Sequence, residues 1–323
     1  MTIKDIYNLA IKLGVSSDPR GRTGVEKSLK RVKRELDDLP ERKREDFDLE
    51  SLTNPYADSR ILFGNPKTKV KRILVGVDIG VGEVLLADRL GKFDLIIGHH
   101  PHGGALSSLH EVMDLQVDLL ATYGVPINIA HHLMEERVEE VSRRFAPFNH
   151  FQSVDAARLL NIPFMCLHTP CDNLGWKLLS SHLEKKEYER LAEVLEELDK
   201  IPEFKIAKKQ KAGPVIFYGS ENSRAGKVRV VEFTGGTEGA KEIYEKLSHA
   251  GVGTIISMHT SDEHREEAKK HHINIIVAGH MVSDSIGANL FLDELEKRGV
   301  KIIPASGLIR VKRGKSKKAS NGD

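Results

Sequence analysis

The sequence predicts an α/β protein in which helices cover a parallel or mixed sheet, and three observations lead to this fold class. From Lys71 onward, short apolar runs rich in β-branched residues alternate with segments of helical period. The runs are apolar on both faces, which is typical of strands that helices cover on both sides. The alternation begins a second time after residue 205, so we expect two lobes.

The elements of the first series follow from this alternation. The strands are expected at 71–79, 93–100, 125–132 and 162–169. The helices between them are expected at 81–92, 107–124, 133–145 and 151–161, with a long helix at 175–201. In the second series, strands are expected at 227–234, 253–260, 274–280 and 301–307, and helices at 240–250, 262–271 and 285–299.

A helical extension precedes the two lobes. Helices are expected at 3–13 and 25–36, and apolar residues recur on one face of the second, which indicates packing on the core. A polar link and a Pro/Gly-containing segment follow. The predicted domains are the helical N-terminal extension at 1–65, a first α/β lobe at 66–204, a second α/β lobe at 205–310 and a basic disordered tail at 311–323.

Composition limits the class of protein. With 323 residues and 40% hydrophobic residues the chain can build a large core, and its two cysteines, Cys166 and Cys171, are too few for a secreted disulfide scaffold. No stretch approaches the roughly 20 apolar residues of a membrane span. We therefore expect a cytoplasmic protein without a membrane partner.

The positive charge is concentrated at the C-terminus. From Arg310 onward the chain carries six cations against Asp323 alone, so the rest has a net charge of −3 although the whole chain has +2. A nucleic-acid binder usually carries its basic residues on the folded surface. The charge therefore argues against a protein that binds nucleic acid.

Polar residues follow the predicted strands, at the edge where sheets of this class bind ligands. The segments are DIG at 78–80, HH at 99–100, HH at 131–132, HTPCD at 168–172, HTSDEH at 259–264 and GHMVSD at 279–284. Imidazoles and carboxylates together favour zinc, manganese, iron or nickel. If a helix starts at about His280, Asp284 lies on the same helix face four residues later.

Three of these segments, LIIGHHPHGG, CLHTPCDN and AGHMVSD, resemble in order the signature motifs of the NGG-one-interacting factor three-like family, also called GTP cyclohydrolase I type 2 homologs. The family patterns are roughly H-H-P, H-T-x-x-D and G-H-x-x-[ST]-E. The resemblance implies two intertwined, related three-layer α/β lobes and a hexameric ring with two metal ions per chain. The ligands it implies are His99, His100, Asp172, His280 and Asp284.

The sequence departs from the family pattern in three places. Asp284 stands where the family has a glutamate, so its reach to two metals is shorter. The stretch between the first two motifs is long and contains His131 and His132, which leaves open that either enters the site. The extension at 1–65 is an addition.

These features predict a dinuclear metal-dependent hydrolase for a nucleotide or another heterocyclic or phosphorylated small molecule, with GTP cyclohydrolase activity implied by the resemblance. The candidate catalytic groups beside the metals are His168, His259 and His131. A metal-binding ring that serves as a scaffold or regulatory protein is the alternative. The two differ in whether the metals keep an open coordination position.

Overall fold

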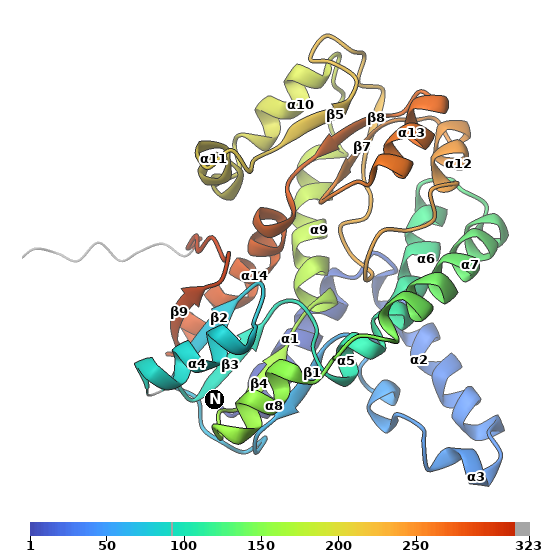
Figure 1. Cartoon of the computed structure of the whole chain (residues 1–323). Coiled ribbons are helices and arrows are strands. Elements are labelled where there is room, and N and C mark those ends of the chain that lie inside the picture. Colours follow the sequence, from blue (N-terminus) through green and yellow to red (C-terminus); the bar gives the residue numbers. More distant parts are fainter. Residues whose placement is uncertain (92, 314–323) are drawn as a thin grey trace, which may run out of the picture.

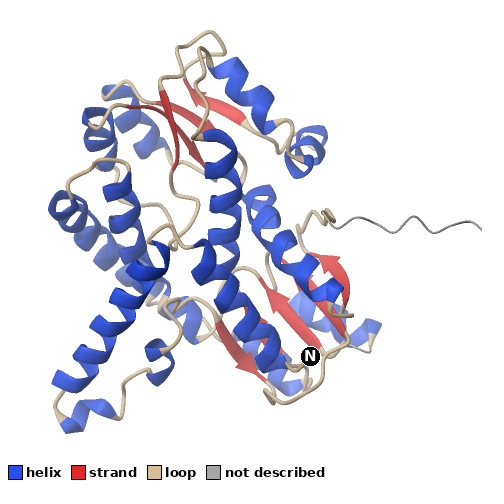
Figure 2. Ribbon diagram, turned by 180° about the vertical axis from the view of Figure 1, so that it is seen from behind, coloured by secondary structure: helices blue, strands red, loops and turns tan. Residues whose placement is uncertain are grey.

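The computed structural model describes residues 1–91 and 93–313, and it contains two sheets with the long helix α9 (Thr169–Leu183) running between them (Figures 1 and 2). Helices cover the sheets. The mixed α/β architecture predicted from the sequence is therefore confirmed. Within the described residues, no helix combines the length and apolar character needed to cross a membrane.

The first sheet has five strands in the order β1-β4-β3-β2-β9. They are β1 (Arg60–Phe63), β2 (Arg72–Gly76), β3 (Leu95–Gly98), β4 (Phe164–Cys166) and β9 (Lys301–Ala305). Strands β9, β2, β3 and β4 are parallel, whereas β1 is an antiparallel edge strand. Leu74, Ile96 and Phe164 lie in register across three of the strands and are fully buried.

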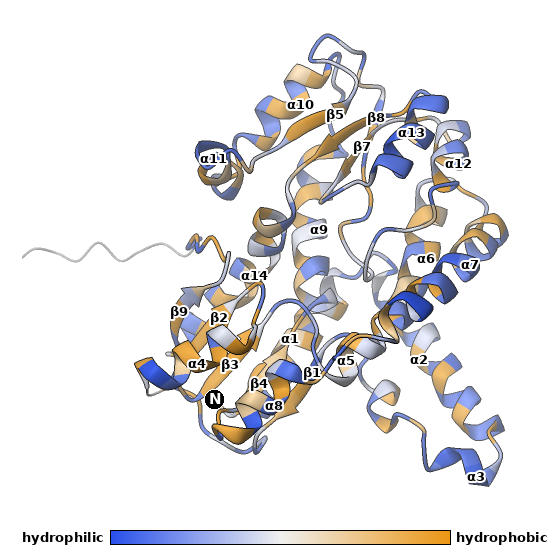
Figure 3. Cartoon of the chain, viewed as in Figure 1, coloured by the Kyte–Doolittle hydropathy of each residue, from blue (hydrophilic) through white to orange (hydrophobic). Residues whose placement is uncertain are grey.

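The second sheet repeats this pattern with four strands in the order β5-β8-β7-β6. They are β5 (Val215–Tyr218), β6 (Lys227–Val230), β7 (Val252–Ser257) and β8 (Asn274–Val277). Strands β6, β7 and β8 are parallel, and β5 is the antiparallel edge strand. The apolar strands of both sheets are orange in Figure 3, whereas surface helix α13 (Asp262–Lys270) is mostly blue.

The remaining helices cover the sheets or extend from them. They are α1 (Ile3–Ser17), α2 (Gly21–Asp38), α3 (Glu41–Arg44), α4 (Val81–Leu90), α5 (Gly104–Ser107), α6 (Asp114–Thr122), α7 (Ile127–Phe145), α8 (Gln152–Leu159), α10 (Leu191–Leu198), α11 (Pro202–Lys209), α12 (Ile243–His249) and α14 (His280–Lys297), with short 3-10 turns at Leu49–Leu52 and Leu109–Met113. Both helices expected in the extension are present. Only Val25 of the apolar face of α2 is fully buried.

Helices α9 and α14 cross in close contact, and glycine makes this possible. A Cβ on Gly287 would overlap the carbonyl oxygen of Cys171 and lie 2.7 Å from its carbonyl carbon. Gly175 faces Gly287 from the other helix. The crossing brings the first turn of α9 and the second turn of α14 together.

One predicted strand is wrong. The segment 125–132 was expected to be a strand, but residues from Ile127 onward belong to α7. Its buried residues Ala130, Met134 and Val141 recur at helical spacing, and Pro126 stands at the helix start. A short apolar run is ambiguous between strand and helix, and here the helical period that follows it decides.

Several other segments differ from the sequence expectation. Strand β1 lies in the range expected as the helical extension, and β9 pairs with β2 in the first sheet although it was expected in the second lobe. The helix expected at 175–201 is divided into α9 and α10, and β5 and α11 were not predicted.

The start of the basic tail is anchored, contrary to the expectation of disorder from residue 311. The guanidinium of Arg313 lies 2.6 Å from a carboxylate oxygen of Glu203, which is completely buried. Asn289 donates to the other Glu203 oxygen at 2.8 Å. Residues 314–323, which carry the rest of the predicted tail, lie outside the described residues.

We expect Arg313→Ala to lower the free energy of unfolding by about 2 kcal/mol, because it leaves a buried carboxylate without its cation. Lys312→Ala is the matched control, since Lys312 is exposed and its ion pair with Glu296 should contribute less than about 1 kcal/mol. Urea denaturation measures both. Equal effects of the two substitutions would contradict a structural role for the Arg313–Glu203 pair.

Candidate metal centre

The carboxyl ends of strands from both sheets carry the polar residues of the site. His99 and His100 directly follow β3, and His168 precedes the first turn of α9 after β4. Helix α14 starts at His280 after β8, earlier than the helix expected at 285–299, and this start places Asp284 one turn further on the same helix face. Asp172 occupies the first turn of α9.

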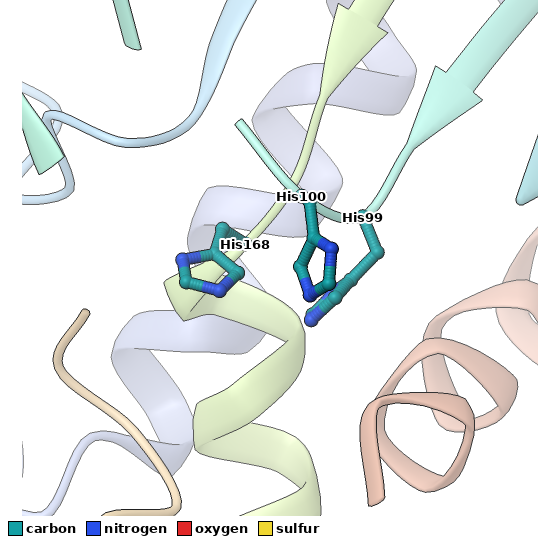
Figure 4. Close-up of side chains that lie close together, drawn as sticks. All are labelled: His99, His100 and His168. Atoms are coloured by element: carbon teal, nitrogen blue, oxygen red, sulfur yellow. The ribbon is translucent and has the colours of Figure 1, made fainter. Parts of the chain in front are cut away.

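These side chains converge. The Nε2 atom of His99 lies 3.2 Å from Asp172 Oδ1 and 3.5 Å from Asp284 Oδ1. The Nε2 atoms of His100 and His280 lie 3.4 and 3.6 Å from Asp284 Oδ2. His168 Nε2 lies 3.6 Å from Asp172 Oδ2. Figure 4 shows the rings of His99, His100 and His168 close together. We call these six residues the candidate metal centre.

Several atoms of the candidate metal centre are buried without a hydrogen bond. They are both ring nitrogens of His99, Asp172 Oδ1 and Asp284 Oδ2. The carboxylates are within ion-pair distance of the imidazoles, but these atoms form no hydrogen bond with them. Buried polar atoms of this kind are costly unless another group satisfies them. A cation bound between them would do so, and nitrogen and carboxylate oxygen are suitable ligands for a divalent transition ion.

Three sets of donors have ligand atoms that all lie within 4.8 Å of one another. They are His99, His100 and His168; His100, His280 and Asp284; and His99, Asp172 and Asp284. Asp284 is shared by two sets, through oxygens that face different imidazoles. All five residues implied as ligands by the resemblance are therefore together, and His168 joins them.

Two further carboxylates contact the imidazoles of His100 and His168 at Nδ1, the nitrogen that does not face the other donors. Asp78 Oδ1 lies 2.6 Å from Nδ1 of His100, and Asp58 Oδ2 lies 2.8 Å from Nδ1 of His168. A carboxylate on Nδ1 fixes the ring and leaves Nε2 for a metal. Asp78 stands at a strand end that the sequence had marked, whereas Asp58 lies in the predicted extension, where no motif pointed to it.

Comparison with known proteins now adds the fold family. The chain is similar to a NIF3 superfamily protein from Sphaerobacter thermophilus, with 27% sequence identity over 95% of this chain and 99% of that chain, and a TM-score of 0.76. The chain has the NIF3 superfamily fold. NIF3 is the short form of NGG-one-interacting factor three, the family that the three motifs resemble.

Two other solved structures are less similar to the chain. Reduced HcgD from Methanocaldococcus jannaschii shares 13% identity over 76% of this chain and 87% of that chain, with a TM-score of 0.48. A Bacillus cereus protein related to NIF3 shares 11% identity over 80% of this chain and 93% of that chain, with a TM-score of 0.40. No protein-family model and no curated protein matches the sequence.

The electrostatics of the NIF3-fold site favour a bound cation. Burial opposes the protonation of His99, but Asp284 and Asp172 outweigh it and hold the pKa of His99 well above its usual value. Burial also opposes protonation of His100, yet Asp284 and Asp78 raise its pKa to about 9. The pKa of His280 is instead lowered to about 4, chiefly by burial. The two carboxylates therefore attract positive charge to this point, and a divalent ion can supply it in place of protons.

The candidate catalytic histidines take different places. His168 belongs to the first donor set, with its Nδ1 engaged by Asp58, so it is placed as a ligand candidate rather than as a separate acid. The ring of His259 packs edge-on against that of His280, with centroids 4.8 Å apart, and belongs to none of the three donor sets. His259 therefore stands beside the candidate metal centre.

His131 is not brought to the candidate metal centre. It lies exposed on α7, where it lines one surface hollow with residues of α2 and α6 and a second with residues of α6 and α7. Its neighbour His132 is exposed and faces Glu135. Both were expected at a strand end, where their side chains would have faced the site. Because both residues lie within helix α7 instead, the strand geometry that would have directed them to the site is absent there.

Proposed function

We propose that this chain is a metal-dependent hydrolase that uses two divalent ions in the candidate metal centre. Asp284 would serve both ions, because each of its oxygens faces a different imidazole. His99 and Asp172 would complete one position and His100 and His280 the other, with His168 within reach of the first. When bound, such ions activate water and polarise a substrate oxygen.

The observation that carries this proposal is the combination of buried donors with one open side. His99, Asp172 and Asp284 are almost completely inaccessible, whereas the side chain of His280 is 39% exposed and that of His100 is 21% exposed. A molecule from solvent can therefore approach from the side of His100 and His280. A purely structural metal would instead be enclosed by its ligands on all sides.

The residues of the chain have defined parts in this proposal. Asp78 and Asp58 orient His100 and His168, so that their Nε2 atoms stay directed at the metals. The buried carboxylates balance the charge of the ions, and the apolar strands beneath exclude water from the closed side. A nucleotide or another phosphorylated or heterocyclic small molecule is the substrate class that the family resemblance supports, and a hexameric ring is the assembly it supports.

We expect elemental analysis of untagged protein to find close to two transition ions per chain, drawn from zinc, manganese, iron and nickel. Reconstituted protein should then hydrolyse at least one member of a panel of nucleotides including GTP, phosphodiesters and cyclic amides. Protein stripped of metal with a chelator should lose that activity and regain it with metal. Activity that survives complete removal of metal would contradict the proposal, and a full metal complement without turnover would favour the scaffold alternative.

A further inference from the structure

The start of α9 carries two donors of the candidate metal centre and packs against residues 1–65. Asp172 lies in the first turn of α9, and His168 stands directly before it. Helix α1 packs against this turn (Figure 1), and the contact is close, because a Cβ on Gly14 would lie 2.7 Å from Cα of Pro170. Two of the six donors therefore lie at a helix start that the N-terminal segment covers.

Asn173, the residue after Asp172, is completely buried and joins separate parts of the chain. Its Nδ2 donates to Oη of Tyr56 at 3.1 Å and lies 3.4 Å from Oδ2 of Asp18, and a backbone carbonyl of α1 is a third acceptor at 3.3 Å. Its Oδ1 accepts a hydrogen bond from the hydroxyl of Thr234, in the segment that follows β6. The side chain of Asn173 cannot rotate without breaking these bonds, so it fixes the turn that carries Asp172.

The partners of Asn173 are held in turn by one another. The hydroxyl of Tyr56 donates to Oδ2 of Asp18 at 2.9 Å, and the guanidinium of Arg20 makes two contacts of 2.9 Å with the same carboxylate. All of these side chains are buried, that of Arg20 being 5% exposed. In a buried polar network of this kind, the loss of one contact leaves other groups without partners, so the network holds a single arrangement.

A second carboxylate of the same segment holds the other donor. Asp58 is completely buried, and its Oδ2 lies 2.8 Å from Nδ1 of His168 and accepts a hydrogen bond of 2.6 Å from the hydroxyl of Thr169. Both donors at the start of α9 are therefore positioned by side chains of residues 1–65.

We propose that residues 1–65 control the metal affinity of the candidate metal centre and that Asn173 is the positioning residue through which they act. The inference rests on the proposed function. A displacement of α1, or of the segment around Tyr56, breaks the bonds of Asn173 and moves Asp172 away from Asp284. Coupling of this kind is reciprocal, so metal binding stabilises the contacts of residues 1–65 by the same factor.

The test compares Tyr56→Phe with Tyr123→Phe in the full-length chain. Tyr56→Phe removes the hydroxyl that joins Asn173 to Asp18, and we expect the zinc affinity to fall about fivefold, as for other coupled sites. The visible absorption of the cobalt-loaded protein, which reports coordination geometry, should change as well. Tyr123→Phe is the matched control, because it removes a buried hydroxyl that donates to Glu184 at the opposite end of α9, at 2.7 Å. It should lower stability but leave the zinc affinity and the cobalt spectrum unchanged.

Asn173→Ala removes all the bonds of the positioning side chain and should weaken zinc binding about tenfold. Hydrogen exchange gives the reciprocal measurement and needs no turnover. In the wild type, zinc should slow the exchange of backbone amides at 54–59. In Asn173→Ala this slowing should be lost, because the metal no longer stabilises the contacts of Tyr56.

The outcomes separate this inference from the proposed function. Wild-type protein that binds no transition metal would overturn the proposed function itself. If the wild type binds zinc and Tyr56→Phe binds it equally tightly, or if zinc leaves exchange at 54–59 unchanged, only the control by residues 1–65 is overturned. An equal loss of zinc affinity in Tyr123→Phe would also overturn that control, because the effect would then follow from a general destabilisation of α9.

Discussion

Asp284→Asn is expected to release at least one metal ion per chain and to lower the affinity for the remaining one by tenfold or more. The substitution keeps the shape of the side chain but removes the negative charge that faces His99, His100 and His280. Asp284 belongs to two of the three donor sets, so its loss affects both positions. Metal titration followed by elemental analysis measures the effect, and the wild type should show two unequal affinities because aspartate reaches less far than glutamate.

The control for this variant is Asp155→Asn, which alters an exposed carboxylate paired with Arg158 on α8. Its metal content should equal that of the wild type. Thermal unfolding with and without metal gives a second measurement, since a ligand at 100 times its Kd stabilises the folded state by about 2.7 kcal/mol, and Asp284→Asn should lose most of that gain. If Asp284→Asn retained two ions at wild-type affinity, Asp284 would not be a ligand.

Gly287→Ala should lower the free energy of unfolding by about 3 kcal/mol and should weaken metal binding at the same time. The new methyl group would overlap the backbone of Cys171, which the crossing of α9 and α14 presses against Gly287. The helices must move apart to accept it. Asp172 follows Cys171 directly and Asp284 precedes Gly287 by one helical turn, so the same movement separates the two carboxylates of the candidate metal centre.

Gly82→Ala in α4 is the matched control, because a Cβ there meets no atom within 4 Å. It should leave metal binding unchanged and alter stability by less than about 1 kcal/mol. Chemical denaturation and metal titration are carried out on both variants. A Gly287→Ala protein that is destabilised but binds metal as tightly as the wild type would show that the helix crossing does not position the donors.

Much of the candidate metal centre could be predicted from the sequence, because its donors follow the ends of strands closely along the chain. An apolar run that ends in His99 and His100, or in Gly279 and His280, marks both the strand and the residues at its carboxyl end. The residues that could not be predicted were those without such a signal. Asp58 meets His168 across 110 positions of chain, through the antiparallel pairing of β1 with β4. Nothing in the residues around Asp58 encodes that pairing.

The errors have a common physical origin. Residues 125–132 contain an apolar run too short to distinguish a strand from the start of a helix. Because a strand was predicted there, His131 was wrongly expected at a strand end. After α14, β9 pairs with the free edge of β2 in the first sheet. Which sheet edge a strand pairs with depends on the whole fold and not on the residues of that strand alone. Local patterns predicted the elements, whereas the partners of the edge strands could not be predicted from them.

The placement of β9 has a consequence for how the protein is made. The ribosome releases β2 more than two hundred residues before β9, yet these strands are neighbours in the sheet. The β2 edge of the nascent sheet therefore stays unpaired until Ala305 has been synthesised, and open edges of this kind favour pairing with other chains. The metal donors are similarly divided, because His280 and Asp284 emerge long after His99 and His100. The complete donor set can bind metal only after Asp284 has emerged, when α14 can fold against α9 and β9 can pair with β2.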